Sequence, residues 1–303
     1  MERFIRKAET LIEALPYIQS FQHKIVVIKL GGSAMTNPGT TAGVLRDIVF
    51  MEAVKMKPVL IHGGGFLISE RMKKSGITPR FVEGLRCTDA DCIRLVHEAM
   101  SEINADLVAR IEAEGGRAEG LVARPDPVIR ARRHLPLLPG PDGFKVPTDI
   151  GFVGEIESTR PGSLFQLTAD DIVPVIAPLG RDEEGNVYNI NGDMMAGAVA
   201  AALGAEKLVF LTDVEGIIRL REGEEPILLS SLNRNEIASL LKEGVISGGM
   251  IPKVRSGLQA LEGGVRKVHI IDGRVKHSLL LEIFTDQGIG TEISNTDQGE
   301  TEA

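Results

Sequence analysis

Two short apolar runs, each ending in glycines, constrain the fold of this chain more than any other feature. The run at 24–30 is rich in β-branched residues and ends at the glycine pair 31–32, and the run at 58–62 ends at the glycine triplet 63–65. Such runs predict buried strands, and glycine lets the backbone turn sharply with its N–H groups uncovered. Uncovered amides before a helix attract anions, and Lys29 adds a positive charge. One such turn is usually only a tight turn, so the rest of the chain must decide.

The order of strand, turn and helix repeats along the chain. Helical periodicity over 42–57, 67–75 and 89–114 alternates with the two strands above. In the second half the predicted strands are 172–176, 207–211 and 268–273, and the predicted helices are 163–169, 194–203, 231–242 and 277–284. This βαβα order predicts an α/β fold with an open, mostly parallel central sheet sandwiched by helices.

Residues 117–158 differ from the rest because six prolines interrupt short alternating runs. We expect hairpins and loops there, over the carboxyl end of the sheet, where open α/β sheets bind ligands. A solvated face is the simpler interpretation of the basic side chains in this segment, a substrate contact is the alternative, and an RNA site is less favoured still. These side chains are Arg124, Arg130, Arg132, Arg133 and His134.

The length of 303 residues and the hydrophobic content of 43% allow one large α/β unit or two lobes. We divide the chain into an N-terminal helix at 1–20, an N-terminal lobe at 21–180 and a C-terminal lobe at 181–303. The first helix carries an apolar stripe and is expected to end before Pro16. The stripe packs either on its own domain or on the same helix of another subunit. The polar tail from Ser294 is expected to fray.

Composition excludes several classes of protein. The net charge of −8 argues against a general nucleic-acid or anionic-membrane binder, so a cationic site must be local. No apolar run reaches the roughly 20 residues of a membrane span, and we expect a cytoplasmic protein. The two cysteines, Cys87 and Cys92, lack a His or Cys at metal-ligand spacing, so we expect reduced thiols and no metal held by the chain.

The glycine turns and two lysines together indicate phosphoryl transfer. The turns at 31–33, 63–65 and 248–249 are expected to meet at one edge of the sheet, with Lys29 and Lys253 approaching from opposite halves. Phosphoryl transfer needs mainly positioning and neutralisation of charge. The sequence has neither a P-loop nor a dinucleotide-binding motif, and no general base stands out. A carboxylate acceptor needs none because, with a pKa of about 4, it is already ionised at neutral pH.

Six segments stand in a characteristic order along the chain: 28–35, 62–65, 84–88, 189–193, 211–214 and 248–253. Together they resemble the N-acetylglutamate kinases of the amino-acid kinase family, and the resemblance covers the chain from the N-terminal helix to about Ile293. It implies the amino-acid kinase fold, with β-hairpins over the acceptor site, an acceptor-binding lobe at 21–180 and an ATP-binding lobe at 181–303. It also implies transfer of the γ-phosphoryl group of ATP to the side-chain carboxylate of N-acetyl-L-glutamate, the second step of arginine biosynthesis.

The resemblance gives several residues a role. Lys29 and Lys253 would stabilise the transferring phosphoryl group, and Asp193 would orient both lysines while also serving as a helix N-cap. The implied acceptor-binding residues are Gly64, Gly65, Arg86 and Asn189. The implied ATP-binding residues are Gly31, Gly32, Gly63, Thr212, Asp213, Gly248 and Met250. Mg²⁺ would be held by ATP phosphates and water. We expect Lys253→Ala and Asp193→Ala to abolish turnover and leave the fold intact, because both residues would lie at a surface cleft.

The two ends of the chain resemble those of arginine-inhibited members of the family. The segment 9–19 is similar to the helix that interlaces their dimers into a hexameric ring. The resemblance implies L-arginine as an inhibitor, a homo-hexamer built as a trimer of dimers or else a homodimer, and a PII-type signalling protein as a candidate partner. The implied arginine site comprises Tyr17, Lys207, His269, Glu282 and Gly288.

The chain departs from the usual family sequence in places that we expect on the acceptor side. Residues 66–67 and 123–127 differ from the family, residues 100–106 keep only Asn104 of its motif, and Gly192 replaces an alanine. Two alternatives to an N-acetylglutamate kinase therefore stay open. One is a paralogue that phosphorylates another N-acylated acidic amino acid. The other is a non-catalytic arginine-sensing homologue, which is disfavoured because a sensor does not need both lysines and Asp193.

Overall fold

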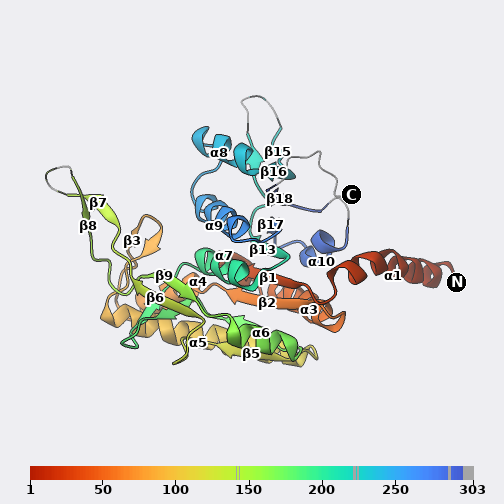
Figure 1. Cartoon of the computed structure of the whole chain (residues 1–303), viewed down its shortest axis with the longest axis horizontal. Coiled ribbons are helices and arrows are strands. Elements are labelled where there is room, and N and C mark those ends of the chain that lie inside the picture. The colour runs from red at the N-terminus through yellow and green to blue at the C-terminus, as the bar shows by residue number, and fades with distance from the viewer. Residues whose placement is uncertain (141, 143, 221–222, 224, 286–287, 296–303) are drawn as a thin grey trace.

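The strands predicted at 24–30, 58–62 and 207–211 lie side by side in the middle of one eight-stranded sheet (Figure 1). This computed structural model describes residues 1–140, 142, 144–220, 223, 225–285 and 288–295. The strands of the sheet, in spatial order, are β16 (Ser231–Asn233), β18 (Thr291–Ser294), β17 (Lys267–Asp272), β13 (Lys207–Thr212), β1 (Ile25–Leu30), β2 (Lys57–His62), β10 (Val173–Ile176) and β5 (Ala118–Leu121). Every neighbouring pair is parallel except β17 and β18. The predicted mostly parallel sheet is confirmed.

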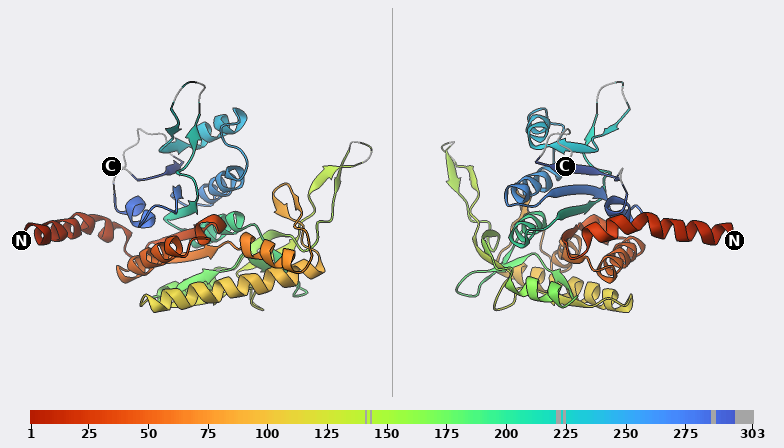
Figure 2. Two further views of the ribbon diagram at one scale, coloured as in Figure 1. Left: turned by 180° about the vertical axis from the view of Figure 1, so that it is seen from behind. Right: turned by 45° about the vertical axis from the view of Figure 1, so that its right-hand side comes forward.

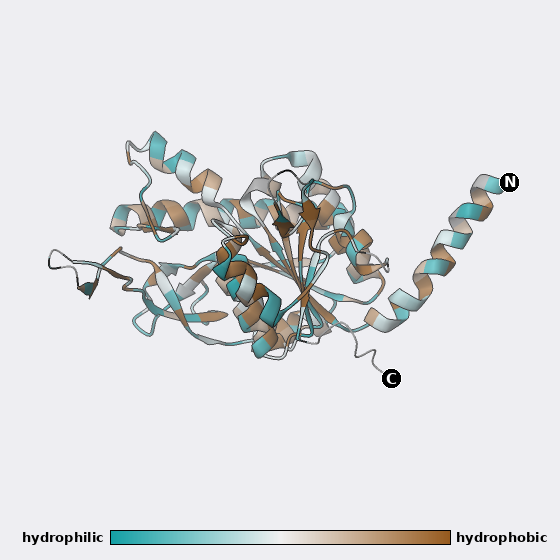
Figure 3. Ribbon diagram, turned by 90° about the horizontal axis from the view of Figure 1, so that it is seen from above, coloured by the Kyte–Doolittle hydropathy of each residue, from teal (hydrophilic) through white to brown (hydrophobic). Residues whose placement is uncertain are grey.

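Each central strand contributes to two cores because successive side chains point to opposite faces. Val27 and Phe210 belong to one core, and Ile28 and Val209 belong to the other. The first core is covered by α6 (Gly162–Ala169), α7 (Gly192–Leu203), α8 (Arg234–Lys242) and α9 (Met250–Glu262), and the second by α3 (Pro38–Ala53), α5 (Ala90–Ala113) and α10 (Ser278–Ile283). Viewed from above, the strands form an apolar band between these helical layers (Figure 3). The helices therefore sandwich the sheet as predicted.

The segment 117–158 forms mainly antiparallel structure, which confirms the predicted hairpins. A second, four-stranded sheet has the order β12 (Val187–Asn189), β11 (Leu179–Arg181), β6 (Ile129–Arg133) and β9 (Gly154–Thr159). Between β6 and β9 the hairpin of β7 (Leu137–Pro139) and β8 (Lys145–Pro147) projects from the body (Figure 2). Two further hairpins are β3 (Phe81–Val82) with β4 (Leu85–Arg86), and β14 (Ile218–Arg219) with β15 (Ile227–Leu228).

The first helix is longer than predicted. α1 (Glu2–Phe21) continues through Pro16 and extends away from the body (Figure 1). Proline removes one helical hydrogen bond, to the carbonyl of Ile12, but Ile12 is 68% exposed, so water can reach that turn of the helix. The stripe residues Phe4 and Leu11 are also exposed, whereas Phe21 packs against the second core. The stripe therefore does not fold back on its own domain, which excludes the first of the two alternatives.

Other predicted boundaries also shift. The segment predicted as a helix at 231–242 begins with β16, because Asn233 caps α8 and forms a capping box with Glu236. The run at 268–273 is not the last strand, since β18 follows it. Ser294, expected to fray, ends β18, and the tail from residue 296 lies outside the described residues.

The remaining helices are α2 (Gly32–Met35) and α4 (Gly65–Lys74), each of which begins in one of the glycine turns. The sheet runs through both predicted lobes without a break: β1 of the first lobe pairs directly with β13 of the second. The lobe boundary at 180 stays a prediction. Among the described residues, no helix combines the length and the apolar character that a membrane span requires.

The helices α7 and α9 approach closely at Gly197, where an added Cβ would lie 2.7 Å from the Ser256 carbonyl oxygen. Gly197→Ala is therefore expected to push the two helices apart and to lower the free energy of unfolding by about 1–3 kcal/mol, measured by urea denaturation. Gly43→Ala in α3 is the control. Its Cβ would meet no atom within 4 Å, so we expect a gain of about 0.4–1 kcal/mol. A neutral Gly197→Ala variant would contradict the close packing of α7 on α9.

Candidate active site

The first two glycine turns meet at the carboxyl ends of β1 and β2. The Gly31 N–H donates to the Leu211 carbonyl oxygen at 3.1 Å, and the Gly63 N–H donates to the Leu30 carbonyl oxygen at 2.9 Å. A Cβ on Gly63 would lie 3.1 Å from the Gly32 backbone nitrogen. The predicted convergence of these two turns is confirmed, and a side chain at Gly63 would crowd the Gly32 backbone.

A buried carboxylate joins the two predicted lysines. Asp193 Oδ1 lies 2.8 Å from Lys29 Nζ, and Asp193 Oδ2 lies 2.9 Å from Lys253 Nζ. Asp193 is 6% exposed and Lys29 is 7% exposed. Lys29 comes from β1, Asp193 from α7 and Lys253 from the start of α9. The fold thus brings together the three residues predicted to be catalytic.

The electrostatics of this triad follow from burial and from the three charges. Burial lowers the pKa of Lys29, Asp193 opposes this effect, and Lys253 adds to it. Burial alone would raise the pKa of Asp193, but Lys29 and Lys253 outweigh it and hold that pKa below its ordinary value. Asp193 is therefore ionised at neutral pH and partly offsets the repulsion between the two lysines.

The start of α7 fixes the direction of Asp193. Asn191 Oδ1 accepts hydrogen bonds from the N–H groups of Asp193, at 2.9 Å, and Met194, at 3.1 Å. The N-cap of α7 is therefore Asn191, and the N-cap role predicted for Asp193 is wrong. At Gly192 a Cβ would lie 3.3 Å from Lys29 Cε, so glycine leaves Lys29 more room than alanine would.

A cavity of about 260 Å³ opens beside the triad. The predicted site residues in its lining are Lys29, Gly32, Gly63, Gly64, Gly65, Arg86 and Asn189. The β3–β4 hairpin supplies Phe81 to another wall, and α5 supplies Met100. The structure therefore places every predicted acceptor-binding residue around one space that also contains a triad lysine.

Arg86 is buried in the wall of this cavity without an acidic partner among the described residues. Its Nη2 donates to the Gly65 carbonyl oxygen at 3.0 Å and to Ser69 Oγ at 2.8 Å, and its guanidinium lies 4.7 Å from the centre of the Phe81 ring. These contacts hold the guanidinium in place and leave its charge uncompensated. Such a group suits an anionic ligand.

The sequence analysis did not single out Thr88, which links two of the predicted acceptor-binding residues. Thr88 is fully buried, and its Oγ1 donates to the Arg86 carbonyl oxygen at 2.8 Å. The side-chain amide of Asn189 donates to the same Oγ1 at 3.5 Å. Thr88 closes the segment 84–88, so its place in that motif was the available signal.

The predicted nucleotide-binding residues are more dispersed. Thr212 and Asp213 lie at the carboxyl end of β13, next to the end of β1, and Thr212 Oγ1 donates to Asp213 Oδ1 at 3.2 Å. Gly248 is exposed, with a φ of 53°. Met250 begins α9 and packs partly on the first core. The described lining of the cavity includes none of these residues or Gly31, and their nucleotide role stays a prediction.

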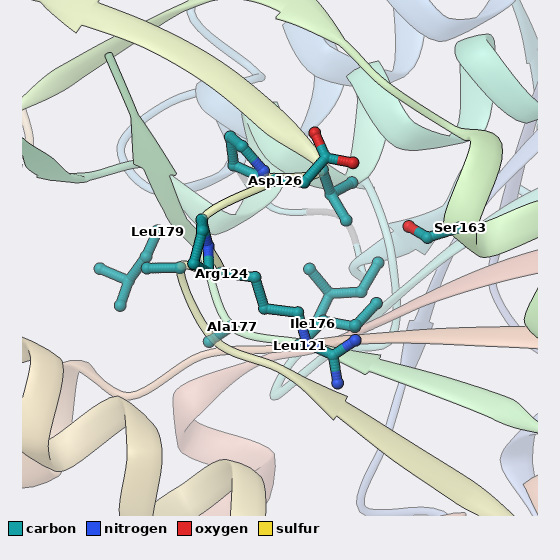
Figure 4. Close-up of a pocket in the computed structure, with 11 residues that line it drawn as sticks. Leu121, Arg124, Asp126, Ser163, Ile176, Ala177 and Leu179 are labelled. Atoms are coloured by element: carbon teal, nitrogen blue, oxygen red, sulfur yellow. The ribbon is translucent and has the colours of Figure 1, made fainter. Parts of the chain in front are cut away.

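Departures from the family sequence line two different cavities. Residues 123–127 line a separate cavity of about 290 Å³ that shares no described residue with the first (Figure 4). Arg124, in that segment, forms an ion pair with Glu119 at 2.7 Å. Of the remaining departures, Met100 and Gly192 do line the first cavity. Segment 123–127 follows the carboxyl end of β5, which is parallel to β10 and β2, and Ala177 and Leu179 of its cavity flank Pro178 of the first cavity, so an acceptor-side role for this segment stays a prediction.

The basic segment has the partners of a solvated face. Arg132 and Arg133 are exposed and pair with Glu155 and Asp149 at 3.0 Å and 2.9 Å.

Both cysteines are free, and burial raises the pKa of Cys92 to about 11. Within the described ranges, no group of three or more His, Cys, Asp or Glu side chains is placed to hold a metal ion.

A further cavity of about 400 Å³ lies at the opposite end of β13, where α1 joins the body. All five residues of the predicted arginine site line it: Tyr17, Lys207, His269, Glu282 and Gly288. Lys207 Nζ lies 3.0 Å from His269 Nε2, and His269 Nδ1 lies 2.6 Å from Glu282 Oε1. Since the lysine donates, His269 carries its proton on Nδ1 and donates to Glu282. Burial lowers the pKa of His269 and favours this neutral form.

Comparison with known proteins agrees with this geometry. Residues 24–272 match the sequence profile of the amino acid kinase family. The chain belongs to the amino acid kinase family. It is 47% identical to the acetylglutamate kinase of Heliobacterium modesticaldum over 292 residues, which cover 96% of this chain and 99% of that protein. It is 46% identical to the acetylglutamate kinase of Aquifex aeolicus, with 97% and 99% of the two chains covered. The resemblance inferred from the motifs is confirmed.

Solved structures give the same fold. N-acetylglutamate synthase from Neisseria gonorrhoeae, complexed with coenzyme A and N-acetyl-glutamate, aligns with a TM-score of 0.82 at 28% identity and covers 96% of this chain. The same synthase complexed with coenzyme A and L-arginine aligns with a TM-score of 0.78 at 27% identity, over 95% of this chain. This chain spans 64% and 65% of the length of those synthase chains.

Asp193 is buried rather than placed at the surface, so we now expect its removal to lower the stability of the fold. Asp193→Asn is expected to lower the free energy of unfolding by about 3–5 kcal/mol at pH 7, because it leaves two ammonium groups in a buried site without their counter-charge. Chemical denaturation measures this loss. Asp126→Asn, at an exposed ion pair with Arg160, is the control and should cost less than about 1 kcal/mol.

The difference in unfolding free energy between the wild type and Asp193→Asn should depend on pH. The pKa of Asp193 in the folded chain lies below the ordinary value of 3.8, so its stabilising charge is fully present above that pH and is lost as pH falls through the folded pKa. The gap in unfolding free energy between the wild type and Asp193→Asn should therefore be constant at neutral pH and narrow in acid. Equal stability of Asp193→Asn and wild type at pH 7 would show that the triad is not buried as described.

Proposed function

We propose that this chain is an acetylglutamate kinase, which transfers the γ-phosphoryl group of ATP to the side-chain carboxylate of N-acetyl-L-glutamate in the second step of arginine biosynthesis. The observation that carries the proposal is the Asp193 carboxylate held between Lys29 and Lys253 beside a cavity containing Arg86. The relatives named acetylglutamate kinase, matched over nearly their whole length, support the same reaction. A cytoplasmic location belongs to this proposal.

The lysines and glycines supply the positive electrostatic surface that phosphoryl transfer requires. Lys29 lines the acceptor cavity, so we assign it to the oxygens on the acceptor side, and Lys253 at the start of α9 to the leaving side. Asp193 holds both ammonium groups in position before any ligand binds, so little reorganisation is needed during the reaction. The acceptor carboxylate is ionised at neutral pH, so the reaction needs no general base, and none is evident among the described residues that line the cavity.

The acceptor would be held by its other polar groups. Arg86 is preorganised to pair with a carboxylate. Thr88 Oγ1 donates its hydrogen to the Arg86 carbonyl oxygen, so it accepts the hydrogen bond from Asn189 Nδ2. Asn189 Oδ1 is therefore left to accept a hydrogen bond from a ligand amide. An N-acylated amino acid offers such an N–H group. This arrangement supports N-acetyl-L-glutamate over free glutamate.

ATP would lie toward the ends of β1 and β13, where we assign contacts to Gly31, Gly32, Gly63, Thr212, Asp213, Gly248 and Met250. The Gly32 and Gly64 amides, at the starts of α2 and α4, suit phosphate oxygens because the first N–H groups of a helix have no partner within it. The N–H groups of Gly31 and Gly63 already donate to backbone carbonyls, so these two glycines would shape the turns rather than supply amides. Mg²⁺, bound to the ATP phosphates, would reduce the negative charge that the lysines face. Asp193 already pairs with two lysines, so it is not free to act as a ligand of Mg²⁺. The ion would therefore be held by ATP phosphates and water.

A hydroxamate assay tests the function and separates it from the two alternatives. With ATP and Mg²⁺, we expect acyl phosphate from N-acetyl-L-glutamate and much less from N-acetyl-L-aspartate, L-glutamate or L-aspartate. Lys253→Met should lower kcat by about 100-fold or more, since it removes a charge that acts on the transferring group. Lys276→Met, at an exposed lysine, is the control.

Preference for a different acceptor would favour the paralogue. Absence of turnover with every acceptor would favour the non-catalytic homologue and refute both enzyme hypotheses.

We further propose that L-arginine inhibits the enzyme by binding in the cavity at the base of α1. That cavity contains both carboxylate and ammonium groups, from Glu282, Glu292, Lys207 and Lys267, as an amino acid with a cationic side chain requires. The related fold of the synthase complexed with L-arginine supports this ligand. The exposed stripe of α1 would pack on the same helix of another subunit, giving a hexamer or, without that contact, a homodimer. A PII-type regulator stays a candidate partner.

Arginine inhibition predicts a linked change in activity and stability. Saturating L-arginine should lower the rate and raise the melting temperature, because a ligand that binds only the folded chain stabilises it. Glu282→Gln should weaken both responses, whereas Glu243→Gln at an exposed ion pair with Arg219 should keep them. D-Arginine serves as the ligand control. If saturating L-arginine left both quantities unchanged in the wild type, the regulatory proposal would fail.

A further inference from the structure

A buried polar pair behind the glycine triplet has no role in the function described above. His62, the last residue of β2, is fully buried, and Asn104 of α5 is 3% exposed. Polar side chains in such positions require partners, and their partners show what they hold in place.

The hydrogen bonds define the tautomer of His62. Asn104 Nδ2 lies 2.8 Å from the Val175 carbonyl oxygen and 3.1 Å from His62 Nε2. A carbonyl oxygen only accepts, so the amide nitrogen of Asn104 faces this side and its second hydrogen points at His62 Nε2. His62 Nε2 is therefore an acceptor, and the ring proton sits on Nδ1. His62 Nδ1 lies 2.8 Å from the Gly63 carbonyl oxygen, to which it donates.

His62 stays in this neutral form at physiological pH. Burial lowers the pKa of His62 to about 4, and the nearby charge of Lys29 acts in the same direction. A proton on Nε2 would also have to face the Asn104 amide hydrogens. Around neutral pH, His62 is thus a fixed donor to the Gly63 carbonyl oxygen.

The direction of the Gly63 carbonyl determines the direction of the next amide. The described chain has no cis peptide bond, so in the Gly63–Gly64 peptide the C=O and the N–H point in opposite directions. A peptide between two glycines rotates with little steric hindrance, so it needs an external contact to fix it. The His62 hydrogen bond supplies that contact, and the Gly64 N–H points away from the His62 ring. Gly64 lines the cavity beside the triad.

The helix α5 also packs close to the same peptide. A Cβ on Gly64 would lie 2.8 Å from Met100 Sδ, one turn before Asn104. Asn104 is itself confined by β5, since a Cβ on Gly120 would lie 2.1 Å from Asn104 Oδ1. Asn104 therefore has little freedom to release His62.

We propose that Asn104 and His62 are positioning residues for phosphoryl transfer: Asn104 selects the Nδ1–H form of His62, and His62 holds the Gly63–Gly64 peptide so that the Gly64 amide serves the reacting groups. This inference rests on the proposed kinase function and deepens it. Neither side chain touches the substrate in this role, and both act through the Gly64 N–H.

Nitrogen NMR of the full-length protein labelled at histidine tests the geometric step. We expect the His62 ring to show a protonated Nδ1 and a bare Nε2, with no titration between pH 6 and pH 8, and the signal to be assigned by its loss in His62→Asn. In Asn104→Leu, His62 loses its Nε2 partner and should change its tautomer balance. A wild-type ring protonated on Nε2 would overturn the proposal.

Kinetics test the functional step. Asn104→Leu should lower kcat by about 10- to 100-fold, because a misdirected amide stabilises the transition state less, while KM for ATP changes by less than about threefold. His62→Asn, whose shorter amide can still donate to the Gly63 carbonyl, should retain more activity than His62→Leu. Leu107→Ala, a buried truncation on the same helix that leaves His62 alone, controls for lost stability.

The kinetic outcomes separate the two proposals. An active wild type with unchanged kcat in Asn104→Leu, or with an equal loss in Leu107→Ala, would overturn the positioning role alone. A wild type inactive with every acceptor would overturn the proposed function and the positioning role together, whatever tautomer His62 shows.

Discussion

The contact of one buried carboxylate with two ammonium groups is the interaction on which the rest of this structure depends. Lys29, Asp193 and Lys253 come from a strand and two helices that are distant in the sequence. A charge in this position is tolerated only when it is paired, so the elements that carry it must pack in one relative position. Glycines at 192 and 197 make that packing feasible, because they let α7 approach both Lys29 and α9. Stability and the proposed chemistry thus place the same demand on the fold.

Glycine loops that present amides have a second requirement, which is rigidity. A backbone without Cβ atoms fits closely around an anion, but it also has more conformations to lose. In this chain the lost freedom is offset by neighbours: the Gly31 and Gly63 amides bond to adjacent strands, and His62 holds the Gly63 carbonyl. A loop that is flexible by composition is therefore fixed by its surroundings.

Much of this arrangement was readable from the sequence, and the remainder has identifiable causes. Strand and helix periodicity gave the central sheet and its two helical layers, and the ordered motifs gave the triad around Asp193. Periodicity did not give the end of α1, because the rule that proline stops a helix fails where water can reach the freed carbonyl. It also missed β16 and β18, which are short and depend on pairing with each other rather than on their own pattern.

The site was predicted in the same uneven way. Residues in glycine turns and charged motifs were found, because their residue types and their order in the sequence indicate their chemistry. Thr88 and His62 stand in motifs that the sequence showed, but their roles were missed because each also depends on a contact across the fold. These contacts are Asn189 to Thr88, and Asn104 to His62 and Val175.

One end of β13 lies at the cavity at the base of α1, and its other end lies near the cavity beside Lys29. Lys207, its first residue, lines the cavity at the base of α1, and Leu211, near its other end, accepts the Gly31 hydrogen bond. Four residues of extended chain separate the two by about 13 Å. From Lys207 to Leu211, β13 is paired in register with β1 on one side and with β17 on the other. Sliding of the strand along its axis would break these hydrogen bonds, so the sheet holds the distal cavity and the Gly31 turn at a fixed separation.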